Sequence, residues 1–152
     1  YYNPFSGEAQ VNTTVPRFLE PYVTAHEMAH QLGYAKENEA NFVGFLACRS
    51  YDNPAFRYSA YYDMYNYALT EVYLRDTARA AAFQRNVHPQ VKKDQREFRD
   101  FYRKYKHPIE PVIMWGYGQF LKANNQPAGK RSYNEVVTWL MAYYKKYGTA
   151  AL

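Results

Sequence analysis

Signals that start and stop α-helices recur along this chain of 152 residues, and they constrain its fold more than any other feature. Asparagine caps a helix, proline fits the first helical position, and glycine ends a helix because it adopts positive φ without a steric cost. Helix starts are therefore expected at Asn53-Pro54 and at Pro89. Helix ends are expected at Gly33 and Gly148. This punctuation predicts a mostly α-helical fold.

Apolar residues recur at helical spacing between these signals, which predicts the order of the elements. We expect about six helices, over residues 17–32, 36–49, 55–84, 108–124 and 132–148, with one more opening at residues 88–89. The last helix begins with a capping box, because Ser132 precedes Glu135 by three residues. At most one short strand is expected, near residues 8–12, and residues 124–130 are the clearest loop. The expected architecture is a single domain over residues 1–152.

The balance of residue types excludes several classes of protein. Hydrophobic residues make up 47% of the chain and charged residues 22%, which excludes a disordered tail and a fibrous repeat. A membrane-spanning helix needs roughly 18 apolar residues, and the longest apolar run, over residues 136–144, is too short. Cys48 is the only cysteine, so an internal disulfide is excluded. The chain begins at Tyr1 without an initiator methionine, and we expect it to be part of a longer protein.

Residues 26–30 read His-Glu-Met-Ala-His and lie within the first expected helix. Residues four apart in a helix lie one turn apart on the same face, so His26 and His30 can bind one Zn²⁺ at about 2.0–2.1 Å. Glu27 then lies beside the remaining coordination position, where a carboxylate can take a proton from water. The chain has 4 histidines, and roughly 0.006 such patterns are expected by chance. Two histidines on a polar surface, or hydrogen-bonded within a core, are the alternative interpretation.

A catalytic zinc has three protein ligands as a rule, so the two histidines need a partner. Gly33 allows the chain to reverse soon after His30, and the next helix can then bring a carboxylate back to the metal. The candidates for this third ligand are Glu37 and Glu39.

The two glutamates lie on different faces of the second helix. Glu37 shares its face with small or polar residues such as Asn41 and Gly44, which leave room for a metal. Glu39 shares its face with large apolar residues such as Phe42, which are more typical of a core. We therefore predict Glu37 as the third ligand and keep Glu39 as the alternative. Asn41 is either a group that orients a ligand imidazole or an ordinary exposed amide.

The two segments together resemble known metallopeptidases. HExxH followed by Glu-x-x-Ala-Asn at residues 37–41 resembles the gluzincins, in which a second helix with a Glu-x-x-Ala/Ser-Asp/Asn pattern supplies the third ligand. A narrower resemblance is to the DUF3810 family, carried by residues 24–33 (TAHEMAHQLG) and 37–48 (ENEANFVGFLAC). Residues 3–9 and 132–137 fit the same family, so the resemblance covers most of the chain.

This resemblance implies a zincin-like zinc metallopeptidase domain, preceded in the family by transmembrane helices. It implies His26, His30 and a glutamate of the second helix as zinc ligands, and Glu27 as the catalytic base. Lys36 stands where the metzincin pattern has its third histidine, and a protonated lysine is no metal ligand, so a glutamate has to fill that role. The implied substrate is a peptide or protein. The resemblance also implies that the full-length protein is anchored to a membrane by a region upstream of this chain.

The proposed hydrolysis needs a hydrogen-bond donor for the tetrahedral oxyanion besides the metal, commonly Tyr, His or Arg. The chain has 18 tyrosines, so the choice is wide. We name Tyr133 as the candidate, with Arg131 beside it and Tyr117 between two glycines as further possibilities. Packing or a solvated surface is the alternative role for each.

A basic stretch over residues 92–106 and a net charge of +5 raise the possibility of a nucleic-acid surface. Asp94 and other acidic residues are interspersed, and Phe98, Phe101 and Tyr105 recur at helical spacing. We therefore favour a solvated helix with its apolar stripe turned inward, and expect no nucleic-acid partner. The alternative to an enzyme is a catalytically inactive helical interaction or regulatory domain that keeps the HExxH pattern.

Overall fold

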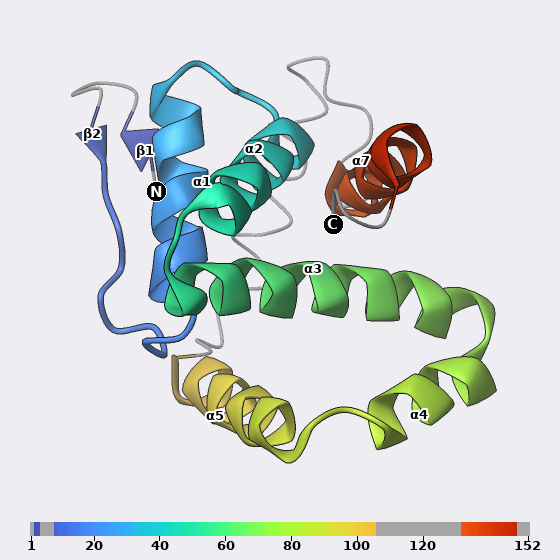
Figure 1. Ribbon diagram of the computed structural model, residues 1–152. Helices are drawn as coiled ribbons and strands as arrows, with labels where there is room; N and C mark the ends of the chain where they lie inside the picture. Colours follow the sequence, from blue (N-terminus) through green and yellow to red (C-terminus); the bar gives the residue numbers. More distant parts are fainter. Residues whose placement is uncertain (1, 4–7, 106–131, 149–152) are drawn as a thin grey trace, which may run out of the picture.

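The computed structural model describes residues 2–3, 8–105 and 132–148, and the side chains of residues 8–105 and 135–148 (Figure 1). The described backbone forms two short strands and six helices. These elements are β1 (Tyr2–Asn3), β2 (Glu8–Ala9), α1 (Glu20–Gln31), α2 (Glu37–Ser50), α3 (Pro54–Arg75), α4 (Thr77–Arg85), α5 (Pro89–Tyr105) and α7 (Ser132–Tyr147). The prediction of a mostly α-helical fold is confirmed.

The strand expected near residues 8–12 corresponds to β2, which pairs with a second strand, β1. The two strands are antiparallel, with Tyr2 opposite Ala9 and Asn3 opposite Glu8. A lone strand would leave its backbone N–H and C=O groups without partners, so the expected single strand requires this neighbour. Residue pattern did not indicate β1 because two residues are too few to show alternation.

Helix α3 crosses the middle of the molecule, with α1, α2 and α7 on one side and α4 and α5 on the other (Figure 1). The hydrophobic core lies on the first side. Its buried members come from α1, α2, α3 and α7 and are Tyr22, Phe45, Cys48, Ala60, Met64, Val136 and Leu140. Segments far apart in the sequence therefore enclose one apolar cluster, and the two helices that carry the candidate ligands are part of it.

The prediction of a single helix over residues 55–84 is wrong, because the helix is interrupted at Asp76, which separates α3 from α4. Asp76 has an extended backbone (φ −153°, ψ 96°), and its side chain accepts a hydrogen bond from the Arg79 N–H at 2.8 Å. An aspartate that caps a new helix stabilises the break by satisfying an N–H that has no intrahelical partner. The spacing of apolar residues does not reveal such a cap, because the cap depends on one polar side chain.

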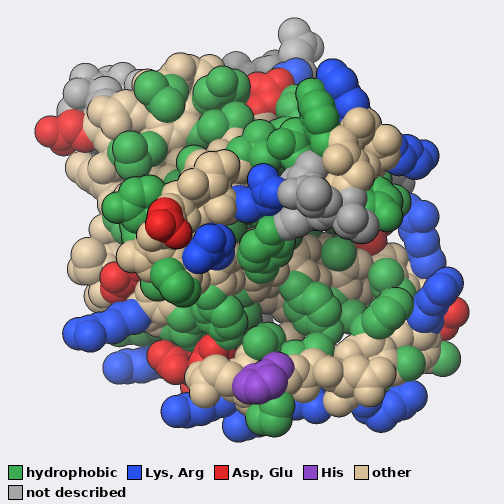
Figure 2. All heavy atoms as spheres, in the orientation of Figure 1, with side chains coloured by type: hydrophobic (Ala, Val, Ile, Leu, Met, Phe, Trp, Pro, Cys, Tyr) green, Lys and Arg blue, Asp and Glu red, His purple; other side chains and the backbone are tan. Residues whose placement is uncertain are grey.

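Helix α5 does not turn an apolar stripe inward as predicted. Its buried residues are Asp94 and Gln95, whereas Phe98 and Tyr105 are exposed. Asp94 therefore does not belong to the solvated face on which it was expected. Figure 2 shows Lys and Arg side chains along the lower edge of the molecule, where α4 and α5 lie, in agreement with a solvated outer face.

The structure tests some of the remaining predictions, and others fall on residues that it does not describe. Gly33, two residues after the end of α1, and Gly148, directly after α7, have positive φ values of 102° and 78°, so both stops are confirmed. The predicted helix over residues 108–124 and the loop over residues 124–130 lie outside the described residues. None of the described helices combines the length and the hydropathy that crossing a bilayer requires.

Candidate metal centre

Helix α1 places His26 and His30 one turn apart on the face that also carries the buried residues Tyr22 and Ala29. The two imidazole side chains are 14% and 12% exposed. Their Nε2 atoms lie 3.1 Å apart, so both rings point toward one position. The HExxH spacing therefore produces the convergence that the sequence predicted.

The third group comes from the start of α2. Gly33 ends α1, the chain reverses over residues 33–36, and Glu37 opens the next helix. One carboxylate oxygen of Glu37 lies 3.4 Å from His26 Nε2, and the other lies 3.6 Å from His30 Nε2. One ligand atom from each of the three residues lies within 4.8 Å of the other two. The Glu37 side chain is 37% exposed, so this cluster is open to solvent on one side.

The chemistry of the donors fits a divalent cation. The distance between His30 Nδ1 and the Tyr34 carbonyl oxygen is 2.7 Å, and a carbonyl only accepts, so Nδ1 carries a proton. In the neutral ring, Nε2 then presents its lone pair to the centre. Backbone carbonyls orient metal-binding histidines in this way. Two imidazole nitrogens on one tetrahedral zinc lie about 3.3 Å apart when each bond is about 2.0–2.1 Å. The 3.1 Å separation here is close to that value.

The cluster also perturbs its own protonation. Hydrogen bonds with His26 and His30 lower the pKa of Glu37 from 4.5 to about 2. The hydrogen bond with Glu37 is the main cause that raises the pKa of His30 above 6.5. The Glu37 carboxylate is therefore held ionised beside His26 Nε2 and His30 Nε2. A proton or a metal cation shared by these two nitrogens would offset the repulsion between their lone pairs. Negative charge next to nitrogen lone pairs favours metal binding.

The structure brings Glu37 rather than Glu39 to the histidines. Glu39 faces elsewhere, with its carboxylate 3.7 Å from Lys36 Nζ. The Glu39 face does contribute to the core, since Phe42 is half-buried and packs against the core cluster. The Glu37 face is nevertheless the more deeply buried one, because Ala40, Asn41 and Gly44 are buried. Small residues allow α2 to approach α1 closely, so their face is the one that becomes buried.

The structure gives less information on the predicted catalytic residues, Glu27 and Tyr133, than on the three candidate ligands. Glu27 is half-buried, and its charge adds to the larger effect of Glu37 in raising the pKa of His30, which places Glu27 near the cluster. Tyr133 lies in the first turn of α7, but its side chain lies outside the described residues. Arg131 and Tyr117 also lie outside them. The roles of Glu27 and Tyr133 stay predictions.

Close packing of α1 on α2 depends on Gly44. A Cβ atom at this position would lie 3.1 Å from the backbone nitrogen of His26 and 3.2 Å from its Cα. Those atoms belong to a helix backbone and cannot rotate away, so a larger residue would push α1 and α2 apart. Gly44 therefore sets the separation of the helices directly beneath His26.

A buried hydrogen bond links the same helices. The Tyr22 hydroxyl donates to Asn41 Oδ1 at 3.0 Å and approaches the Asn41 backbone oxygen at 3.2 Å. Asn41 therefore accepts from Tyr22, while His26 Nδ1 is buried and makes no hydrogen bond within the described part of the chain. Sequence reasoning missed Tyr22, although its place four residues before His26 puts it on the ligand face.

One protein-family model matches this chain, and the match extends over residues 1–141, from β1 into α7. That model is described as "Protein of unknown function (DUF3810)". The curated proteins contain no match to this chain, and neither do the solved structures. Because the match includes α1, α2 and most of the sequence, the chain belongs to the DUF3810 family.

Proposed function

We propose that this protein is a zinc-dependent metallopeptidase that hydrolyses peptide bonds. The observation that carries the proposal is the convergence of His26 Nε2, His30 Nε2 and the Glu37 carboxylate on one position. Two imidazoles and a carboxylate are a donor set that catalytic zinc uses, and three ligands leave a coordination position open. The resemblance to gluzincins, which rests on the same residues, supports this assignment.

The residues of the centre divide between two roles in the proposed reaction, holding the ion and moving the proton. His26, His30 and Glu37 would hold the ion, which supplies Lewis acidity toward water and the scissile carbonyl. Glu27 takes a proton from the attacking water and delivers it to the leaving amine. The exposed side of Glu37 leaves room for an extended peptide to reach the centre.

Tyr133 remains the proposed donor to the oxyanion. The Asn38 side-chain amide donates to Glu135 Oε2 at 2.8 Å, which ties the first turn of α7 to the first turn of α2. Tyr133 is two residues before Glu135, and Asn38 follows Glu37 directly. The backbone of Tyr133 therefore lies at the end of α2 from which Glu37 reaches the histidines.

Two variants test the proposal. The purified protein is expected to hold one equivalent of zinc by elemental analysis and to lose it in His26→Ala. Glu27→Gln is expected to keep the zinc and to lose peptide hydrolysis, because an amide cannot accept the proton. Hydrolysis that survives in Glu27→Gln would contradict the base assignment. Zinc held without any hydrolysis by the unmodified protein would favour the alternative, an inactive interaction or regulatory domain.

Three further expectations stay predictions. The peptide or protein nature of the substrate and the membrane anchor upstream both follow from the family resemblance. The absence of a nucleic-acid partner follows from the mixed charge of residues 92–106. A filter-binding measurement with single- and double-stranded DNA checks this last expectation, and saturable binding at physiological salt would contradict it.

A further inference from the structure

We propose that Tyr22 is a positioning residue for the metal centre, because its hydroxyl ties Asn41 to α1 and so sets the distance between Glu37 and the two histidines. This inference rests on the proposed metal-binding function. It assigns a role to a tyrosine that does not itself touch the metal.

The hydrogen bond between Tyr22 and Asn41 lies one helical turn from the ligands on both helices. Tyr22 precedes His26 by four residues, and Asn41 follows Glu37 by four residues. Residues four apart share a helix face, so a bond between one such pair constrains the pair one turn away. Both side chains are buried, at 4% and 2% exposure, so water does not compete for the bond.

Tyr22 is itself fixed by contacts with the other core helices. Its backbone N–H donates to Ser59 Oγ of α3 at 3.1 Å, which satisfies an N–H in the first turn of α1. The Cys48 thiol of α2 lies 3.4 Å from the Pro21 carbonyl oxygen, one residue earlier. The Tyr22 ring also belongs to the hydrophobic core cluster. A side chain held in this way can serve as a fixed reference for α2.

The presence of an amide at position 41 is poorly explained by stability alone. Asn41 Nδ2 is buried and makes no hydrogen bond within the described residues. A buried donor without a partner destabilises the folded state, and an apolar side chain of similar shape would avoid that cost. We therefore assign the role of Asn41 to its Oδ1 atom, which accepts the hydrogen bond from Tyr22.

The experiment compares zinc affinity in Tyr22→Phe, Asn41→Leu and the double variant, measured by competition with a chelator. Tyr22→Phe is expected to weaken zinc binding about tenfold, which is the size of effect that supporting groups have on metal sites. Asn41→Leu is expected to have the same effect or a smaller one, because the Tyr22 hydroxyl keeps the Asn41 backbone oxygen as an acceptor at 3.2 Å. The double variant is expected to bind zinc no more weakly than Tyr22→Phe alone, because that change already removes the hydroxyl that donates to Asn41. It leaves neither partner unsatisfied, so it carries the comparison if a single variant does not fold.

Cobalt provides a readout that a merely structural role would not move. The visible absorption of bound Co²⁺ is expected to change in Tyr22→Phe, because the angle between the ligands changes. Tyr65→Phe is the matched control, since it removes a hydroxyl that donates to Gln84 at 3.2 Å between α3 and α4, away from the ligands. This control should keep both the zinc affinity and the cobalt spectrum.

The outcomes separate the two proposals. If the unmodified protein binds no zinc, the proposed function fails and this inference fails with it. If it binds zinc, but Tyr22→Phe keeps the same affinity and the same cobalt spectrum, only the positioning role is overturned. A loss of affinity in Tyr65→Phe as large as in Tyr22→Phe would also overturn it, because the effect would then report general loosening.

Discussion

The two sides of α3 are held together by different chemistry. Toward α1, α2 and α7 the buried side chains form an apolar cluster that includes Phe45 and Val136. Toward α4 and α5 no described residue joins that cluster: α4 buries only the small side chain of Ala80 among its described residues, and the buried residues of α5 are Asp94 and Gln95. The candidate metal centre lies on the apolar side, where close packing leaves the helices little freedom to shift.

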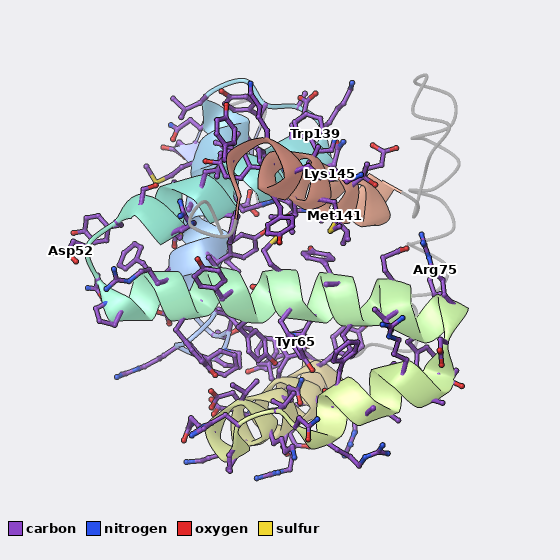
Figure 3. All side chains as sticks on the ribbon, turned by 45° about the vertical axis from the view of Figure 1, so that its right-hand side comes forward. Asp52, Tyr65, Arg75, Trp139, Met141 and Lys145 are labelled. Atoms are coloured by element: carbon purple, nitrogen blue, oxygen red, sulfur yellow. The ribbon has the colours of Figure 1, made fainter. Side chains whose placement is uncertain are left out.

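The polar side depends on a chain of side-chain hydrogen bonds. Asp94 accepts from the Tyr58 hydroxyl of α3 and from Gln90 within α5. Tyr65 points from α3 toward α4, as Figure 3 shows, and its hydroxyl donates to Gln84. Gln84 in turn donates to Gln95 of α5. Such bonds contribute about 1 kcal/mol each, so this side should open more readily than the apolar side.

The largest expected effect comes from opening the apolar side. Phe45 is 1% exposed, and Phe45→Ala should lower the free energy of unfolding by about 3–5 kcal/mol, because it removes a buried ring and leaves a cavity. Urea denaturation followed by circular dichroism measures this change. Phe98→Ala, at an exposed position of α5, is the control and should cost less than about 1 kcal/mol. Equal effects would remove the distinction between the two sides.

The pH dependence of stability tests a buried carboxyl in α3, the helix that both sides share. Burial raises the pKa of Asp63 in α3 from 3.8 to about 7. Because the folded pKa lies above the unfolded one, the folded chain keeps this proton as the pH rises. The associated stability is fully present below about pH 4 and is lost by about pH 7. At 1.36 kcal/mol for each pKa unit, the change amounts to at most ~4 kcal/mol.

Asp63→Asn removes this titration and should flatten the stability curve between about pH 4 and pH 7. The variant should also be more stable than the unmodified protein at pH 8, where Asp63 is charged. Urea unfolding at several pH values measures both effects. Asp52→Asn, at a fully exposed carboxylate, is the control and should leave the curve unchanged. An unaltered curve in Asp63→Asn would show that this carboxyl is not the source of the pH dependence.

A change on the polar side should have a local effect. Asp94→Ala removes the acceptor of both Tyr58 and Gln90, and should lower stability by about 2 kcal/mol. Hydrogen exchange is expected to become faster in the amides of α5 and to stay unchanged in α1 and α2. Zinc affinity should also stay unchanged. Weaker zinc binding in Asp94→Ala would mean that the two sides are coupled.

The smallest change in stability should have a large effect on the metal centre. Gly44→Ala places a Cβ against the His26 backbone, at a cost of roughly 1–3 kcal/mol that is offset by about 1 kcal/mol of helix propensity. Stability should therefore fall by only about 1 kcal/mol, whereas zinc affinity should fall more than tenfold as the ligand helices separate. Ala47→Ser, on the exposed face of α2, is the control for both measurements. Unchanged zinc affinity in Gly44→Ala would contradict the role of this close approach.

Much of the candidate site follows from residue spacing alone. His26 and His30 share a face because a helix repeats every 3.6 residues, and Gly33 ends that helix because of its φ. The preference for Glu37 over Glu39 agrees with the structure, although the face with Glu37 proved to be the deeply buried one. Tyr22 was missed because a tyrosine among 18 carries no distinctive pattern of its own.

Local pattern in the sequence determined the helical class, most helix ends and the pairing of two histidines with a nearby carboxylate, because these depend on residues a few positions apart. Only the tertiary structure decided the burial of Asp94 and the bond from Tyr22 to Asn41. Each of these arises from a contact between a side chain and its particular surroundings. Periodicity reports which residues share a face, but the free energy of burial decides which face turns inward and what it meets there.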